Sequence, residues 1–212
     1  MMKILIGTPI HISKDYCMER WLENVVRLRK VYPADLLMVD NSVGTGYIKQ
    51  VKNYCNKLGI KDYEIKHLDI AQGNEVDKSI DEQIHERVAR CQEIIRKYVL
   101  KRDYDAWFSW ECDQIIPVDA LDKLTEIMQT GSYMMVNHNC WDKNVADGLC
   151  FDWGVTLVNR DYLKKYGFLL EFGTDPEPDS WYNAQAWYRE RLKRDGSPFV
   201  DLIGVISPVL HI

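Results

Sequence analysis

Residues 105–117, DAWFSWECDQIIP, carry the pattern that decides the fold prediction. The apolar run Ala106–Trp110 ends abruptly at Glu111-Cys112-Asp113, and a second apolar run follows at once. Strands that are covered on both faces of a sheet have continuous apolar runs, because neither set of side chains meets water. The stretch therefore predicts a buried strand that ends in two carboxylates one residue apart.

Strands and helices alternate along the rest of the chain. Apolar residues recur at helical spacing after the first strand, as in Trp21, Leu22 and Val25. Strands are expected at 3–7, 35–40, 63–68, 105–110, 132–138 and 151–159, with an extended segment at 199–210. Helices are expected at 16–31, 47–58, 80–98, 118–128, 161–166 and 180–193. This order predicts an α/β fold with a mostly parallel central sheet and helices on both faces.

Composition narrows the class of protein. The 212 residues suit one domain, and a hydrophobic content of 46% suffices for a sizeable core. A net charge of −5 argues against a nucleic-acid binder, which usually has a basic face. No apolar run approaches the roughly 18 residues of a membrane span, and the N-terminus turns polar too soon for a signal peptide. The six cysteines form no CxxC pair, so we expect reduced, buried thiols in a cytoplasmic protein.

The predicted sheet also predicts where a ligand binds. In open α/β sheets, ligands bind outside the carboxyl ends of the strands. Three groups of residues stand at such ends here, namely Thr8-Pro9, Asp40-Asn41-Ser42 and Glu111-Cys112-Asp113. We expect all three groups to face one crevice.

The spacing of Glu111 and Asp113 suggests a cation site. In an extended segment, residues two apart point to the same side, so both carboxylates face one way and Cys112 faces the other. Two adjacent carboxylates repel one another, and a bound divalent cation removes that repulsion. Mg²⁺ and Mn²⁺ prefer oxygen ligands and often bind substrate phosphates as well. The alternatives are that one carboxylate caps the helix beginning near Val118, or that both are simply exposed.

The sequence resembles the glycosyltransferases of the GT-A fold, close to the family 2 type. The similar blocks run in family order over nearly the whole chain: KILIGTPIH (3–11), MERWLENVVRL (18–28), LLMVDNS (36–42), RVARCQEIIRKYV (87–99), YDAWFSWECDQIIPVDALDKL (104–124), WGVTLVNRDYLKKYGF (153–168) and VDLIGVISPVLHI (200–212). The resemblance implies a single Rossmann-like GT-A domain, with a donor-binding half at 1–117 and an acceptor-side half at 118–212. It implies transfer of a sugar from a nucleotide-diphosphate sugar to an acceptor hydroxyl on a glycan, lipid or protein, with Mn²⁺ or Mg²⁺.

The resemblance also implies roles for residues near the nucleotide. Thr8 and Pro9 would line the base pocket, and Asp40, with Asn41 beside it, would hydrogen-bond the base. Arg90 matches a helix arginine near the nucleotide. Arg87 lies at a neighbouring position of the same helix. Both arginines could instead form ion pairs with Glu86 and Glu93 on a solvated helix face.

The family's DxD motif matches the acidic segment with one change. Glu111 replaces the first Asp and Asp113 matches the last, with Cys112 between them at the donor site. His211 matches a C-terminal histidine that can complete the metal site, and a neutral imidazole suits Mn²⁺. The alternative for His211 is a frayed chain end without function.

The resemblance also implies that the catalytic base and the acceptor-binding residues lie in the second half of the chain. An inverting transfer needs a carboxylate to deprotonate the acceptor hydroxyl, and Asp179, with Glu177 close by, occupies the matching region. The family's adjacent Glu-Asp pair is absent, Asp179 also suits a helix N-cap, and a retaining enzyme needs no base there. Trp141, Trp153 and Trp181 are candidates for packing on a sugar face, with core packing as the alternative.

Other functions compete with glycosyl transfer. A sugar nucleotidyltransferase usually has a glycine-rich, basic loop after the first strand, whereas GTPIHISKDYC (7–17) has one lysine and no glycine cluster. A dinucleotide dehydrogenase is disfavoured because no GxGxxG follows that strand. A non-catalytic nucleotide-sugar-binding scaffold of the same fold stays open, because a fold alone does not establish catalysis.

Overall fold

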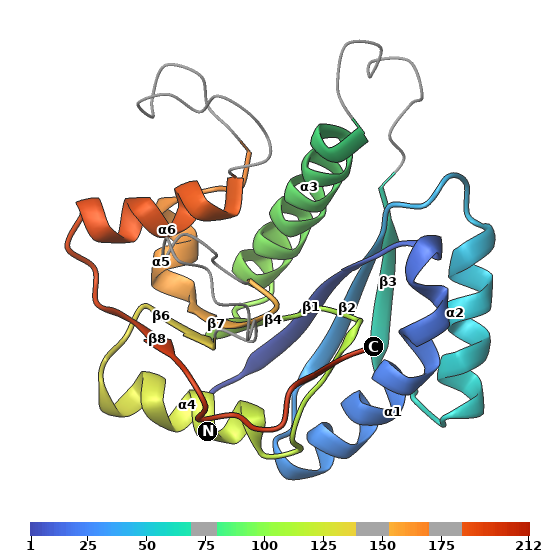
Figure 1. Ribbon diagram of the computed structural model, residues 1–212, viewed down its shortest axis with the longest axis horizontal. Helices are drawn as coiled ribbons and strands as arrows, with labels where there is room; N and C mark the ends of the chain where they lie inside the picture. The colour runs from blue at the N-terminus through green and yellow to red at the C-terminus, as the bar shows by residue number, and fades with distance from the viewer. Residues whose placement is uncertain (69–79, 139–152, 170–183) are drawn as a thin grey trace.

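In the described part of the chain, a seven-stranded sheet forms the centre of the protein (Figure 1). The computed structural model describes residues 1–68, 80–138, 153–169 and 184–212. The strand order is β3-β2-β1-β4-β7-β6-β8, and β7 alone of these seven runs antiparallel to its neighbours. The strands are β1 Ile4–Ile10, β2 Asp35–Asp40, β3 Tyr63–His67, β4 Ala106–Trp110, β6 Met135–His138, β7 Val155–Asn159 and β8 Phe199–Leu202. The predicted α/β fold with a mostly parallel sheet is confirmed.

Helices cover both faces of the sheet, as Figure 1 shows. Side chains of α1 Asp15–Val31, α2 Gly46–Lys57 and α4 Ala120–Thr130 share one core cluster. Side chains of α3 Ile80–Lys101, α5 Arg160–Lys165 and α6 Ala184–Arg194 share the other. Neighbouring strand residues alternate between these clusters, so Ile4 and Ile6 pack on the first and Leu5 packs on the second. This double burial explains why the strands are apolar throughout.

Two elements near the acidic segment were not predicted from the sequence. A short 3-10 helix, η1 Ile12–Lys14, follows β1 directly. A two-stranded sheet pairs β5 Gln114–Ile115 with β9 Leu210–His211. The extended segment expected at 199–210 is interrupted, because β8 ends at Leu202 and β9 begins only at Leu210. Strand pairing between residues this far apart leaves no periodic signal in a local window.

Helix α3 approaches β1 very closely at Gly7. A Cβ atom on Gly7 would lie 2.5 Å from Cγ2 of Ile95 and 2.7 Å from Nε1 of Trp107. The Trp107 indole donates a hydrogen bond to the Gly7 carbonyl at 2.9 Å. Only a residue without a side chain fits here, and the close approach places α3 beside the carboxyl ends of the strands.

No helix in the described ranges combines the length and apolar character needed to cross a bilayer.

Candidate functional site

A cavity of about 460 Å³ lies at the carboxyl ends of β1, β2 and β4. Most of the strand-end residues that were expected to face one crevice line it together, namely Thr8, Pro9, Asn41, Glu111, Cys112 and Asp113, whereas Asp40 and Ser42 do not line it. The remaining wall comes from η1, α3, the start of β7 and α6, including His11, Ser13, Lys14, Arg87, Gln92, Trp153 and Gln185. The topology thus brings several of the predicted residues to one site, where their binding roles stay predictions.

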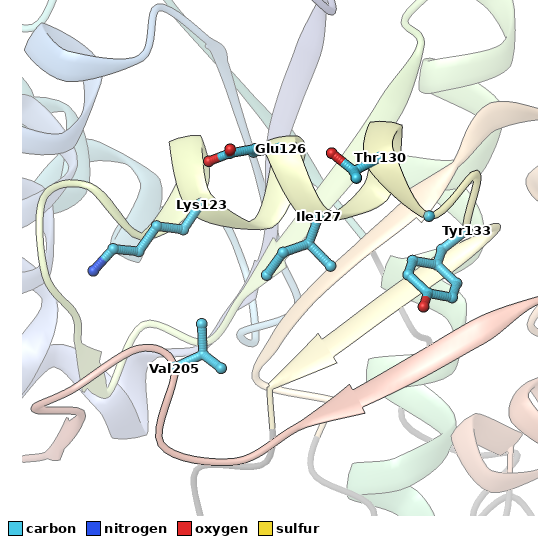
Figure 2. Close-up of a pocket in the computed structure, with 7 residues that line it drawn as sticks. Lys123, Glu126, Ile127, Thr130, Tyr133 and Val205 are labelled. Atoms are coloured by element: carbon cyan, nitrogen blue, oxygen red, sulfur yellow. The ribbon is translucent and has the colours of Figure 1, made fainter.

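A second hollow, of about 540 Å³, lies between α4 and the C-terminal segment. Figure 2 shows Ile127 of α4 above Val205 of that segment, with Lys123 and Tyr133 at the sides. Of the predicted donor, acceptor and metal residues that the structure describes, none lines this hollow. The strand-end cavity is therefore the candidate site.

The acidic segment is held in place from three sides. The Glu111 N–H donates to the Gly154 carbonyl at 2.9 Å, and the Ile212 N–H donates to the Asp113 carbonyl at 2.9 Å. Buried Asn24 of α1 accepts from the Ile116 N–H at 2.8 Å and donates to the Ile116 carbonyl at 3.0 Å. The C-terminal end is thus tied to the acidic segment, and these hydrogen bonds hold the backbone that carries the two carboxylates.

Cys112 separates the two carboxylates and packs into the core below α1. A hydrogen bond with Cys17 and complete burial raise the pKa of the Cys112 thiol well above its usual value. The thiol therefore stays protonated at neutral pH and is a poor nucleophile or metal ligand. All four cysteines in the described part of the chain are free and buried, as expected: Cys17, Cys55, Cys91 and Cys112.

Asp113 forms an ion pair with Lys14, a residue that the sequence analysis did not select. The Lys14 Nζ donates a hydrogen bond to Oδ2 of Asp113. Partial burial lowers the pKa of Lys14, but the hydrogen bond and the attraction of Asp113 raise it by more, so its pKa lies above the ordinary value. Lys14 is the one lysine in the segment after the first strand, which was the signal available in the sequence.

Asp40 is fully buried and holds the turn that follows β2. Its Oδ1 accepts from the Ser42 N–H at 3.0 Å, and its Oδ2 lies 3.0 Å from Nδ1 of His67. The Ser42 hydroxyl in turn accepts from the Ile12 N–H at 2.8 Å. Asp40 therefore joins the loops after β1, β2 and β3, whereas Asn41 beside it lines the cavity. A base contact by Asp40 stays a prediction.

The structure separates the two candidate arginines of α3. Arg87 lines the cavity on the same wall as His11. Burial and the nearby Arg87 charge lower the pKa of His11, so the imidazole is neutral at pH 7. Arg90 instead donates to Oε1 of Glu86 from Nε at 2.8 Å and from Nη2 at 2.6 Å. The ion-pair alternative thus describes Arg90, whereas Arg87 lines the cavity and its binding role stays a prediction.

Gln92 is a cavity residue that the sequence analysis missed. Its side chain is only 1% exposed, and its Oε1 accepts no hydrogen bond from any described residue. A buried acceptor without a partner is costly, so this oxygen suits a donor group on a ligand. No periodic or motif signal distinguishes Gln92 from the apolar stripe around it.

Trp153 combines core packing with a place in the cavity wall. Its ring lies 5.5 Å from the rings of Phe168 and Tyr188 and 6.1 Å from that of Trp107. The side chain is almost fully buried, which favours the core-packing alternative over a sugar-stacking surface. Trp141, Trp181, Glu177 and Asp179 lie outside the described residues.

Two of the predicted metal ligands, Glu111 and Asp113, line the cavity, whereas His211 does not. Gln114 lies between two of them, with its Nε2 3.4 Å from Oε2 of Glu111 and 3.3 Å from Nε2 of His211. In the described ranges, no three His, Cys, Asp or Glu side chains are grouped to hold a metal ion. Carboxylates suit Mn²⁺ or Mg²⁺ and an imidazole suits Mn²⁺, but a cation at Asp113 would take the place of the Lys14 ammonium.

Solved glycosyltransferases have a similar fold. Mannosyltransferase PcManGT from Pyrobaculum calidifontis, in complex with GDP-Man and Mn²⁺, matches with a TM-score of 0.68 and 13% identity, over 96% of this chain and 55% of that one. S. aureus TarS 1-349 in complex with UDP-GlcNAc matches with a TM-score of 0.53 and 11% identity, over 77% of this chain and 47% of that one. A putative nucleotide-diphospho-sugar transferase from Desulfovibrio desulfuricans G20 matches with a TM-score of 0.54 and 10% identity, over 96% and 80%.

These likenesses establish the GT-A-like fold that the sequence resemblance implied. This chain spans about half the length of PcManGT and of the TarS fragment. No model of a protein family matches the sequence, and a search among curated proteins finds no significant relative.

Proposed function

We propose that this protein transfers a sugar from a nucleotide-diphosphate sugar to an acceptor hydroxyl. The observation that carries the proposal is the strand-end cavity, which is lined by the carboxylates Glu111 and Asp113 and by the cations Lys14 and Arg87. The GT-A-like fold supports it, because PcManGT and TarS were solved with GDP-Man and UDP-GlcNAc.

The chemistry of the cavity wall suits a donor of this class. Lysine and arginine donate charge-assisted hydrogen bonds to phosphate oxygens, and Lys14 and Arg87 stand where such a group would enter. Thr8, Pro9 and Asn41 at the ends of β1 and β2 provide a wall for the base. The donor half is thus proposed to lie within residues 1–117.

Glu111, Asp113 and His211 are the residues proposed to hold Mn²⁺ or Mg²⁺. A bound cation neutralises charge that develops on a departing nucleoside diphosphate. Asp113 is proposed as the main ligand, since it lines the cavity and its carbonyl accepts a hydrogen bond from the Ile212 N–H.

A thermal-shift panel of UDP, GDP, CMP and dTDP, each with Mn²⁺ and with EDTA, tests the function. A ligand that binds the native state raises the unfolding midpoint by mass action. We expect a nucleoside diphosphate with Mn²⁺ to raise the midpoint by several degrees, and the responding base identifies the donor. A protein that responds to none of these nucleotides, with or without Mn²⁺, would contradict the proposal.

Asp179→Asn is expected to reduce turnover by about 100-fold or more and to leave donor affinity unchanged, because a general base acts on the acceptor. Glu177→Gln is the matched variant two residues away, expected to have the smaller effect. The measurement is steady-state transfer with the responding donor, together with donor binding by calorimetry. Full activity in Asp179→Asn would remove this residue as the base.

A non-catalytic scaffold is the second candidate. The observation that favours it is the set of contacts at the acidic segment, where Lys14 engages Asp113 and Gln114 lies between Glu111 and His211. Metal-dependent hydrolysis of the donor distinguishes the two functions. A protein that binds a nucleotide sugar and never cleaves it would be the scaffold.

A further inference from the structure

Lys14 occupies a position from which it can reach both a carboxylate and a ligand. It ends η1 directly after β1, and its side chain lines the cavity. The Lys14 side chain is 43% exposed, whereas the Asp113 side chain that it contacts is 16% exposed. The ammonium therefore stands at the open side of a largely enclosed carboxylate.

The ion pair has an electrostatic reason in the free protein. A carboxylate withdrawn from water is costly unless a positive group or hydrogen-bond donors accompany it. Lys14 provides that positive charge for Asp113. A cation bound at Asp113 would meet the ammonium at the carboxylate whose Oδ2 Lys14 already contacts, so the two positive charges compete for one site.

The displaced ammonium would meet a phosphate group. A lysine has three donors on a flexible stem and can turn to a new anion without rearranging the backbone. Lys14 is also the N-cap residue of α1, and its side chain makes no cap hydrogen bond there. The positive end of the α1 macrodipole adds to the attraction for an anion at this place.

We propose that Lys14 is a diphosphate-binding residue that neutralises Asp113 in the free protein and competes there with a divalent cation. The inference rests on the proposed function, since it assigns part of the donor site. It predicts effects of opposite sign when Lys14 is replaced: tighter binding of a metal ion alone, and weaker binding of a diphosphate alone.

Lys14→Met is the test, with Lys123→Met as its matched control. Lys123 is equally exposed, at 43%, and forms an ion pair with Asp119 on α4, outside the cavity. Calorimetry measures Mn²⁺ alone, and separately pyrophosphate in EDTA, which presents a diphosphate without a base. Lys14→Met is expected to bind Mn²⁺ about 3- to 10-fold more tightly, because an ammonium is removed from the metal's place. It is expected to bind pyrophosphate about 10- to 100-fold more weakly, because a charge-assisted hydrogen bond is lost.

The outcomes are distinguishable. Opposite shifts in Lys14→Met, with Lys123→Met like the wild type and Lys14→Arg close to it for pyrophosphate, support the proposal. The proposal is overturned if Lys14→Met binds Mn²⁺ and pyrophosphate as Lys123→Met does. It is also overturned if only one of these two affinities changes. If a nucleotide still raises the unfolding midpoint of the wild type in that case, the proposed function survives and only the role of Lys14 is lost.

Discussion

Asp113→Asn is expected to abolish Mn²⁺-dependent donor binding and to reduce sugar transfer by about 10²- to 10³-fold. Asp113 lines the cavity, and its backbone is clamped by Ile212. An amide of nearly the same shape removes the negative charge while keeping the packing. We therefore expect the unfolding midpoint to stay within a few degrees of the wild type.

The measurement combines transfer kinetics with calorimetric titration of Mn²⁺ and of the donor. Asp119→Asn is the matched control, because Asp119 is also ion-paired with a lysine but lies at the start of α4, outside the cavity. Pyrophosphate binding in EDTA should persist in Asp113→Asn, because Lys14 is then released from its partner. Wild-type Mn²⁺ dependence in this variant would show that Asp113 holds no metal.

Trp107→Ala is expected to lower the free energy of unfolding by about 3–5 kcal/mol. The Trp107 side chain is fully buried, and its ring lies 5.4 Å from that of Phe168. Its indole N–H donates to the Gly7 carbonyl, so truncation leaves a cavity and also removes a hydrogen bond. The packing that is lost lies where α3 approaches β1 at Gly7.

Denaturant unfolding measures this loss. Trp187→Ala is the control, since Trp187 lies on α6, is only partly buried and stacks its ring 5.0 Å from the Arg194 guanidinium. Trp187→Ala is expected to lower the free energy of unfolding by less than about 1 kcal/mol. Equal losses in the two variants would contradict the central place of Trp107 in the core.

The residues at the strand ends show how much of the candidate site could be predicted from the sequence. Continuous apolar runs indicated β1, β2 and β4, and the rule for open sheets placed Asn41, Glu111 and Asp113 at one crevice, as observed. Both arginines lie on the predicted helix, but the sequence did not show which of them faces the cavity and which forms an ion pair. Arg90, three residues after Arg87 on α3, contacts Glu86, whereas Arg87 lines the cavity.

The sequence by itself determined the order of strands and helices, the class of fold and the edge of the sheet where a site forms. These features follow from hydrophobic periodicity, which is a local property of the chain. Only the tertiary structure decided which polar groups meet. Lys14 and Asp113 are 99 residues apart, Asn24 and Ile116 are 92 apart, and Gln114 and His211 are 97 apart. Such contacts depend on the direction in which each side chain points once the elements are packed, and local periodicity carries no information about that direction.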